Sequence, residues 1–297
     1  MTPLHILIVV WVMLGWAFNA IIVKLAMQHW SVFAFTAARF GLLIPLLIFC
    51  WVKPAGYRRL VMLACVFAGG FCMSSIALDL GIQAGLLALL FQTNIFFAVI
   101  WSYFLNKDKP TLYEILGMLL AFLGVLFLLS DTFSFEGVHL LSVAVALLGA
   151  SMMGLYSTLM RRTQMTNAFS GVIWVNSLAF FPIAGLAIHQ LGLDACIACL
   201  QQINPSISLY LFISSFVLTA LSGYLWYLMI RRYPLSTLGS YMFLTPLFAF
   251  ILANIVLDEQ FNYHEFGACI MILLGIIVSQ LGHKIRHHIV GPKKHGS

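Results

Sequence analysis

The sequence predicts an all-α membrane protein with ten transmembrane helices, and three observations carry this prediction. Hydrophobic residues make up 62% of the 297 residues and charged residues 8%, against roughly 45–50% and about 25% in soluble domains. Ten apolar segments with mostly short connections follow one another along the chain. Lys and Arg gather in every second connection and in the C-terminal tail. A soluble core could not wrap ten such segments on all sides, so we expect them to lie in a bilayer.

Each segment is long enough to cross the roughly 30 Å apolar core of a bilayer at about 1.5 Å per residue. The segments span residues 4–27, 31–51, 60–80, 83–105, 112–130, 139–160, 168–189, 208–230, 235–257 and 263–281. The boundary between the third and the fourth is weak, since only Asp79 and Gly81 mark a turn there. The connection 191–207 is the long one, and within it we expect a short interfacial helix over 194–202.

The basic residues predict the orientation in the membrane. The first, third, fifth, seventh and ninth connections contain no Lys or Arg, whereas the sixth, for example, contains Arg161 and Arg162. Short loops rich in Lys and Arg stay on the cytoplasmic side during insertion. We therefore expect both termini in the cytoplasm, with residues 284–297 as a basic and disordered tail. The net charge of +6 then reflects this orientation and implies no nucleic-acid partner.

An internal repeat is predicted, with residues 1–131 and 138–283 as two five-helix units. When the second half is laid over the first, Asp108 meets Glu259 and Glu114 meets Glu265. Matched acidic residues at a fixed separation are harder to obtain by chance than matches between apolar residues. Because each unit crosses the membrane an odd number of times, the second must be inverted, which is the plan of many secondary transporters.

Short motifs in both halves follow a pattern that is found in a known family. They are Trp16-Ala-Phe-Asn-Ala-Ile-Ile-Val-Lys24, Ala37-Ala-Arg-Phe40, Ala84-Gly-Leu86, Gly223-Tyr-Leu-Trp226, Arg232-Tyr233 and Leu244-Thr-Pro-Leu-Phe248. In this the chain resembles the EamA-type transporters of the drug/metabolite transporter superfamily. Asp108 stands where that family usually has Glu. The resemblance covers nearly the whole chain and implies ten helices, a bacterial inner-membrane location and export of amino acids or other small metabolites. It is nearest to exporters of cysteine-related amino acids.

Lys24 and Arg39 are the basic residues inside predicted segments. An ionisable side chain at the membrane centre costs at least about 2.5–3.5 kcal/mol, so each needs a reason. Arg39 is a candidate for binding a substrate carboxylate or for gating; alternatively it bonds to helix carbonyls or to Asp79. Lys24 lies nearer the surface, where it could snorkel. A Lys24–Asp79 or Arg39–Asp79 ion pair is the predicted gate.

Polar residues in the fourth and ninth segments predict a binding cavity near the membrane midplane. Thr93 and Asn94 are preferred because the repeat places Thr245 and Pro246 opposite them. Pro246 has no N–H for the carbonyl one turn earlier, which leaves an acceptor for a ligand. The alternative for these residues is hydrogen bonding between helices. Further lining candidates are Asn19, Ser151, Asn176, Ser222, Tyr224, Trp226 and Tyr241.

The sequence lacks the motifs that would indicate an enzyme or an ATPase. The sequence has no HExxH or nucleophile-elbow motif and no expected pair of buried carboxylates that would favour an enzyme, and it has no P-loop that would indicate an ATPase. Cys196 and Cys199 form an isolated CxxC, which is weak evidence for a disulfide or metal site, so we expect no metal and no cofactor. We predict a secondary transporter that works by alternating access as a monomer, with a small-molecule substrate and the lipid bilayer as its partners. The alternative is a multidrug-type exporter of amphipathic or cationic compounds.

Overall fold

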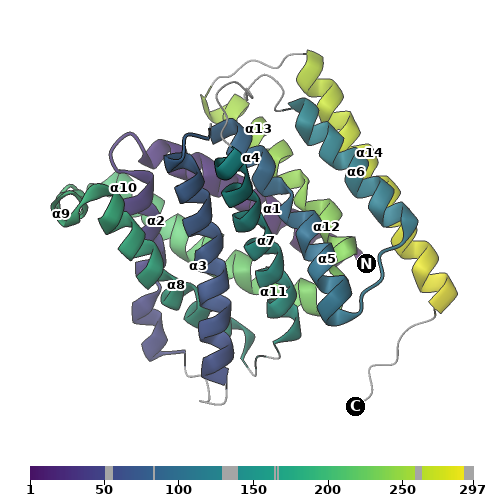
Figure 1. Ribbon diagram of the computed structural model, residues 1–297, viewed down its shortest axis with the longest axis horizontal. Coiled ribbons are helices and arrows are strands. Elements are labelled where there is room, and N and C mark those ends of the chain that lie inside the picture. Colours follow the sequence, from purple (N-terminus) through teal and green to yellow (C-terminus); the bar gives the residue numbers. More distant parts are fainter. Residues whose placement is uncertain are drawn as a thin grey trace.

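The computed structural model describes residues 1–50, 56–82, 84–128, 140–163, 165, 167–257 and 263–290 (Figure 1). Within these ranges the regular structure is helical, without strands. Seven helices are long and apolar enough to cross a membrane: Pro3–Ala26, Tyr57–Asp79, Leu86–Asn106, Leu140–Arg162, Ala168–Leu191, Pro205–Arg232 and Leu235–Val256. Three shorter apolar helices are Val32–Ile48, Leu112–Phe127 and Gly267–Leu281. The all-α prediction is confirmed, and a spanning length is confirmed for seven helices.

The elements fall on the predicted segments. In the first half they are α1 (Pro3–Ala26), α2 (Val32–Gly41), η1 (Ile44–Ile48), α3 (Tyr57–Asp79), α4 (Ala84–Gln92), α5 (Asn94–Asn106) and α6 (Leu112–Leu128). In the second half they are α7 (Leu140–Arg162), α8 (Ala168–Leu191), α9 (Leu193–Gln201), α10 (Pro205–Phe212), η4 (Ile213–Leu221), α11 (Ser222–Arg232), α12 (Leu235–Met242), α13 (Leu244–Leu257) and α14 (Tyr263–Val290). The short helix expected in the long connection is α9. Residues 131, 138, 139, 259 and 291–297, used in the predicted repeat and tail, lie outside the described ranges.

Two of the predicted segments are interrupted near their middle. The fourth divides at Thr93 into α4 and α5, and the ninth divides at Phe243 into α12 and α13. In the ninth segment the interruption follows from Pro246, which sits in the first turn of α13, where a missing N–H is tolerated. At the fourth, the hydroxyl of Thr93 and the amide of Asn94 donate to the carbonyls of Leu90 and Phe91. These side chains thereby satisfy carbonyls at the end of α4.

The eighth segment contains a different irregularity, because η4 (Ile213–Leu221) is a π-helix between α10 and α11. The segment contacts α1 both within the π-helix and beyond it, in α11. Ser214 donates to Asn19 Oδ1 at 2.6 Å, and the ring of Trp226 packs edge-on against Trp16 at 5.4 Å between centroids.

The closest helix pair is α6 with α14, which lie side by side along one edge of the molecule (Figure 1). Their backbones meet at Gly117 and Gly275. A Cβ on Gly275 would lie 2.4 Å from the Ala121 nitrogen and 2.6 Å from the Gly117 oxygen. Small residues allow this approach, which drives helix association in membranes.

The C-terminal end of α14 extends beyond the last predicted transmembrane segment. The helix continues to Val290, so residues 284–290, which we expected to be disordered, are helical.

Candidate functional site

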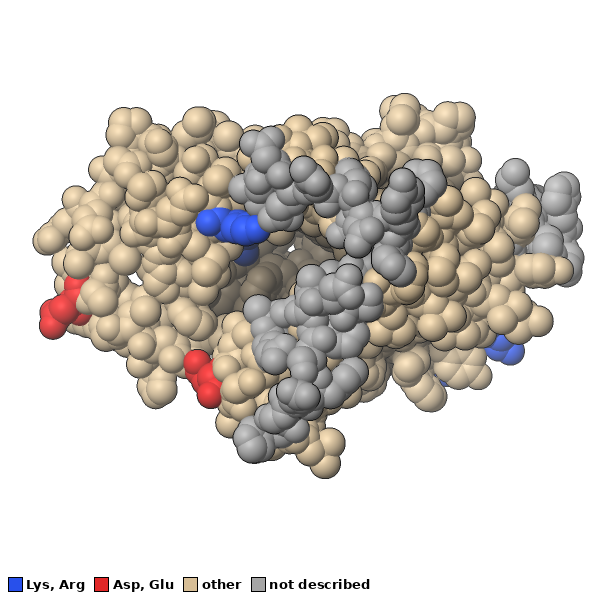
Figure 2. Space-filling model, turned by 90° about the horizontal axis from the view of Figure 1, so that it is seen from above, with Lys and Arg blue, Asp and Glu red and all other residues tan. Residues whose placement is uncertain are grey.

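A cavity of about 350 Å³ lies between α1, α2, α3 and α8. Its walls come from the last turns of α1, α3 and α8 and from the first turns of α2, so it lies toward one end of the helices. Figure 2 looks down on the molecule and shows this face hollowed, with a Lys or Arg side chain at the edge of the hollow. Polar lining residues are Asn19, Thr36, Arg39, Cys72, Ser74 and Ser75. The cavity is therefore amphipathic.

Arg39 is the charged residue among the described lining residues. Its side chain is 5% exposed, and its Nε atom has no hydrogen-bond partner. The guanidinium carbon lies 4.6 Å from the centroid of the Phe40 ring. A buried cation without a hydrogen-bonded counter-charge is costly, which makes Arg39 the most unusual polar group in the cavity.

Asp79, the acidic partner in both predicted gating pairs, has a different partner in this structure. The carboxylate of Asp79 accepts a hydrogen bond from the Gln190 side chain. Within the described ranges no ion pair joins Asp79 to Arg39. Lys24 is exposed on the last turn of α1. Both candidate gating pairs stay predictions for another conformation.

The other predicted binding residues do not line this cavity. Thr93 and Asn94 bond to their own helix, and Thr245 Oγ1 lies 3.4 Å from the Met13 sulfur. Three further candidates contact side chains of neighbouring helices: Ser151 accepts from Trp101 Nε1 at 3.2 Å, Tyr224 packs on Phe169, and Trp226 packs on Trp16. Tyr241 is buried, and Asn176 and Ser222 donate to backbone carbonyls of their own segments. Of the predicted set, the structure brings Asn19 and Arg39 together.

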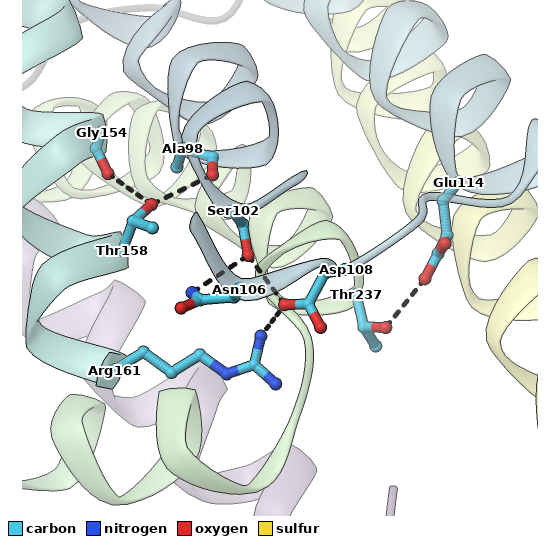
Figure 3. A network of polar contacts seen from close by, with 9 residues as sticks. All are labelled: Ala98, Ser102, Asn106, Asp108, Glu114, Gly154, Thr158, Arg161 and Thr237. Carbon is cyan, nitrogen blue, oxygen red and sulfur yellow. Dashed lines mark hydrogen bonds and ion pairs between the residues drawn. The ribbon is translucent and has the colours of Figure 1, made fainter. Parts of the chain in front are cut away.

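A polar network at the opposite end of the helices was missed in the sequence (Figure 3). Arg161 of α7 forms an ion pair with Asp108, which also accepts a hydrogen bond from Ser102 at 2.7 Å. Thr158 bonds to the Ala98 carbonyl of α5 at 3.2 Å. The network ties the end of α5 to α7. Nothing in the sequence pointed to the partner of Asp108 on α7.

A second part of this end joins α6 to α12 (Figure 3). Glu114 is fully buried, and it accepts hydrogen bonds from the Thr111 N–H at 2.7 Å and from the Thr237 hydroxyl at 2.9 Å. Because the Thr111 hydroxyl accepts from the Glu114 N–H at 3.2 Å, the two residues form a capping box. The Thr-x-x-Glu spacing was the signal that could have found it.

Further polar contacts close the same end between α1, α7 and α11. His5 Nδ1 lies 2.7 Å from the Tyr233 hydroxyl, and the Arg232 guanidinium lies 2.8 Å from His5 Nε2. The Tyr227 hydroxyl donates to the Thr163 carbonyl at 2.8 Å and accepts from the Met165 N–H at 3.0 Å. Thus the helices are joined by polar contacts at the end away from the cavity.

Known relatives cover nearly the whole chain. A protein of Salmonella typhimurium named "probable amino-acid metabolite efflux pump" is 24% identical over 284 residues, covering 93% of this chain and 94% of the relative. A protein of Escherichia coli with the same name is 24% identical over 282 residues, covering 91% and 93%. An uncharacterized transporter of Bacillus subtilis is 25% identical, covering 90% of this chain and 83% of the relative.

A solved crystal structure has the same fold. It superposes with a TM-score of 0.74 at 18% sequence identity, covering 96% of this chain and 99% of that chain.

The family comparison and the helices agree. The family and the relatives point to a transporter rather than an enzyme, and the seven apolar helices make it a multi-pass membrane protein. Because the model of the EamA-like transporter family matches residues 3–130 and again residues 140–281, the chain belongs to the EamA-like transporter family.

Proposed function

We propose that this protein is a secondary transporter that exports amino acids or related small metabolites by alternating access. The observation that carries the proposal is the contrast between the two ends of the helices. At one end a partly open cavity lies between α1, α2, α3 and α8. At the other end polar contacts join α5 to α7, α6 to α12 and α1 to α11. Alternating access needs one closed and one open end.

The helix packing supports the inverted repeat that such a mechanism uses. α6 packs on α14, α2 on α8, and α5 on α12, and each pair joins segments at the same position in the two proposed units, 1–131 and 138–283. The packing of α5 on α7 has its counterpart in the packing of α13 on α1. A two-fold relation between the units accounts for this pattern.

The interrupted helices support the same plan. The interruptions at Thr93 and Phe243 fall at corresponding places in the proposed units. Discontinuous helices at corresponding positions are typical of transporter repeats, because they free backbone groups beside the transport pathway. We place Thr93, Asn94, Thr245 and Tyr241 along this pathway, together with Ser151, Tyr224 and Trp226.

The substrate class rests on the relatives and on the cavity. Two relatives are named as probable amino-acid metabolite efflux pumps, and a carboxylate suits a cavity that contains Arg39. The competing multidrug-type exporter would favour a roomier aromatic cavity without fixed charge. We further propose that the protein works as a monomer in the bacterial inner membrane, with both termini in the cytoplasm. In this proposal it needs no cofactor, metal, ATPase subunit or nucleic acid.

Release from proteoliposomes tests the proposal. Vesicles containing the purified protein are loaded with a mixture of amino acids, related metabolites and an aromatic cation, and release is followed by mass spectrometry with and without a pH gradient. We expect selective release of amino acids or related metabolites relative to protein-free vesicles. Release of the aromatic cation alone would favour the multidrug-type exporter. If folded protein releases no compound, the proposed function is wrong.

A further inference from the structure

We infer that Arg39 binds the carboxylate of a small zwitterionic substrate in the cavity between α1, α2, α3 and α8. This inference rests on the proposed function, because it names a binding position of the transported substrate. It places that position in the cavity at one end of the helices and not at the interruptions of α4/α5 and α12/α13.

The first argument is the incomplete bonding of Arg39. A guanidinium group carries five N–H donors in a planar fork that matches a carboxylate. The side chain is 5% exposed, its Nε lacks a hydrogen-bond partner, and no described acidic residue pairs with it. The ring of Phe40 at 4.6 Å stabilises the positive charge but offers no acceptor in the plane of the fork. A carboxylate ligand would supply both the acceptor and the opposite charge.

The second argument is the distribution of donors and acceptors. Asn19 Oδ1 already accepts from Ser214 at 2.6 Å, so the Asn19 amide nitrogen is left to donate to a ligand. On α3 the hydroxyls of Ser74 and Ser75 donate to the carbonyls of Gly70 at 2.9 Å and Phe71 at 3.1 Å. Their oxygens are left to accept. The α1 and α2 wall therefore offers donors to a carboxylate, and the α3 wall offers acceptors to an ammonium group.

The third argument is the remaining surface of the cavity. Phe33, Phe71, Ile183 and Leu186 form apolar parts of the wall, which suit a hydrocarbon side chain. A volume of about 350 Å³ is at the small end of ligand pockets, which span roughly 300–1,000 Å³. Arg39 is the one charged residue among the described residues that line the cavity. A single positive charge suits a singly charged carboxylate better than a phosphate dianion.

Cys72 provides a direct readout, because it lines the cavity. Purified protein in detergent is treated with N-ethylmaleimide, and alkylation of each cysteine is followed by mass spectrometry. The probes are individual amino acids at millimolar concentration, the amines that lack their carboxylate, the carboxylic acids that lack their amine, and inorganic phosphate. Cys196 of α9, which is outside the cavity lining, is the internal reference.

We expect at least one amino acid to slow alkylation of Cys72 severalfold without affecting Cys196, and its matched amine to have no effect. Arg39→Gln should abolish this protection, whereas Arg59→Gln, which removes an exposed cation in the first turn of α3 and outside the cavity lining, should preserve it. If Cys72 is alkylated at the same rate in Arg39→Gln as in the wild type when no probe is present, the cavity of the variant is intact. If the rate differs, the Arg39→Lys variant is used in place of Arg39→Gln, and it should weaken the protection.

Other results would overturn the inference. These are protection by amines or phosphate in place of carboxylates, equal protection in the Arg39 variants, or no protection by any probe. Release from proteoliposomes without protection of Cys72 would move the substrate to another site and leave the proposed transport function standing. Protection without release would support the binding site and contradict transport.

Discussion

Replacing Gly275 by Ala should destabilise the protein, because the new methyl group has no room between α6 and α14. The Cβ would lie 2.4 Å from the Ala121 nitrogen and 2.6 Å from the Gly117 oxygen. Both neighbours are backbone atoms, so no side chain can rotate away and the helices must separate. Overpacking costs about 1–3 kcal/mol, partly offset by about 0.5–1 kcal/mol from replacing glycine inside a helix.

The chain offers a matched control in Gly185 of α8. A Cβ built there meets no atom within 4 Å, so Gly185→Ala has the same change in backbone freedom without the steric conflict. We expect Gly185→Ala to melt at or slightly above the wild-type temperature. For Gly275→Ala we expect a net loss of about 1–2 kcal/mol, or roughly 2–8 °C at about 2–4 °C per kcal/mol.

Both variants are purified in the same detergent, and unfolding is followed by intrinsic fluorescence on heating and by the rate of unfolding at fixed temperature. The second measurement is needed because membrane proteins often unfold irreversibly. If Gly275→Ala and Gly185→Ala are equally stable, the backbones of α6 and α14 do not approach as closely as described, and the reasoning from this contact is wrong.

Three further predictions concern the polar contacts and α9. Asp108→Asn and Arg161→Gln should be non-additive, with a coupling energy of about 1 kcal/mol in a double-mutant cycle of unfolding; additive losses would show that the pair contributes nothing. Glu114→Gln should lower the free energy of unfolding by about 1–3 kcal/mol, because its NH₂ group faces the donors of Thr111 or Thr237; wild-type stability would contradict this. Burial, and secondarily the charge of Cys199, raises the pKa of the Cys196 thiol above its ordinary value, so less thiolate forms at a given pH. Its alkylation rate should therefore reach half-maximum at higher pH than that of a free thiol, and Cys199→Ser should move that midpoint downward.

The positions of the helices could be predicted from the sequence because each depends on a continuous stretch of apolar residues. The interruption of the ninth segment had a local signal in Pro246. The interruption of the fourth segment had no local signal of this kind, because Thr93 and Asn94 are as compatible with hydrogen bonding between helices as with a break in the helix.

The cavity could be predicted only in part. Arg39 and Asn19 were identified by their polarity, but their meeting with Ser74 and Ser75 depends on which faces of α1, α2 and α3 converge. Periodicity within one helix does not determine that rotation. The Asp108–Arg161 pair was missed for the same reason, because Asp108 lies in the connection after α5 and Arg161 lies on α7, and these segments are distant in the sequence.

The π-helix over residues 213–221 has a consequence for how this chain tolerates insertions and deletions. In a regular α-helix, Ser214 and Trp226 would be separated by about three and a third turns and would point about 120° apart. Both nevertheless face α1, through Asn19 and Trp16, because the wider turns absorb the difference. Deleting one residue within this π-helix would let the segment relax to a regular α-helix, in which the same two side chains would be eleven residues apart and would point only about 20° apart. The π-helix thus accommodates one extra residue without changing which face of α11 meets α1, whereas a one-residue insertion or deletion in α11 itself would rotate every later side chain by about 100°.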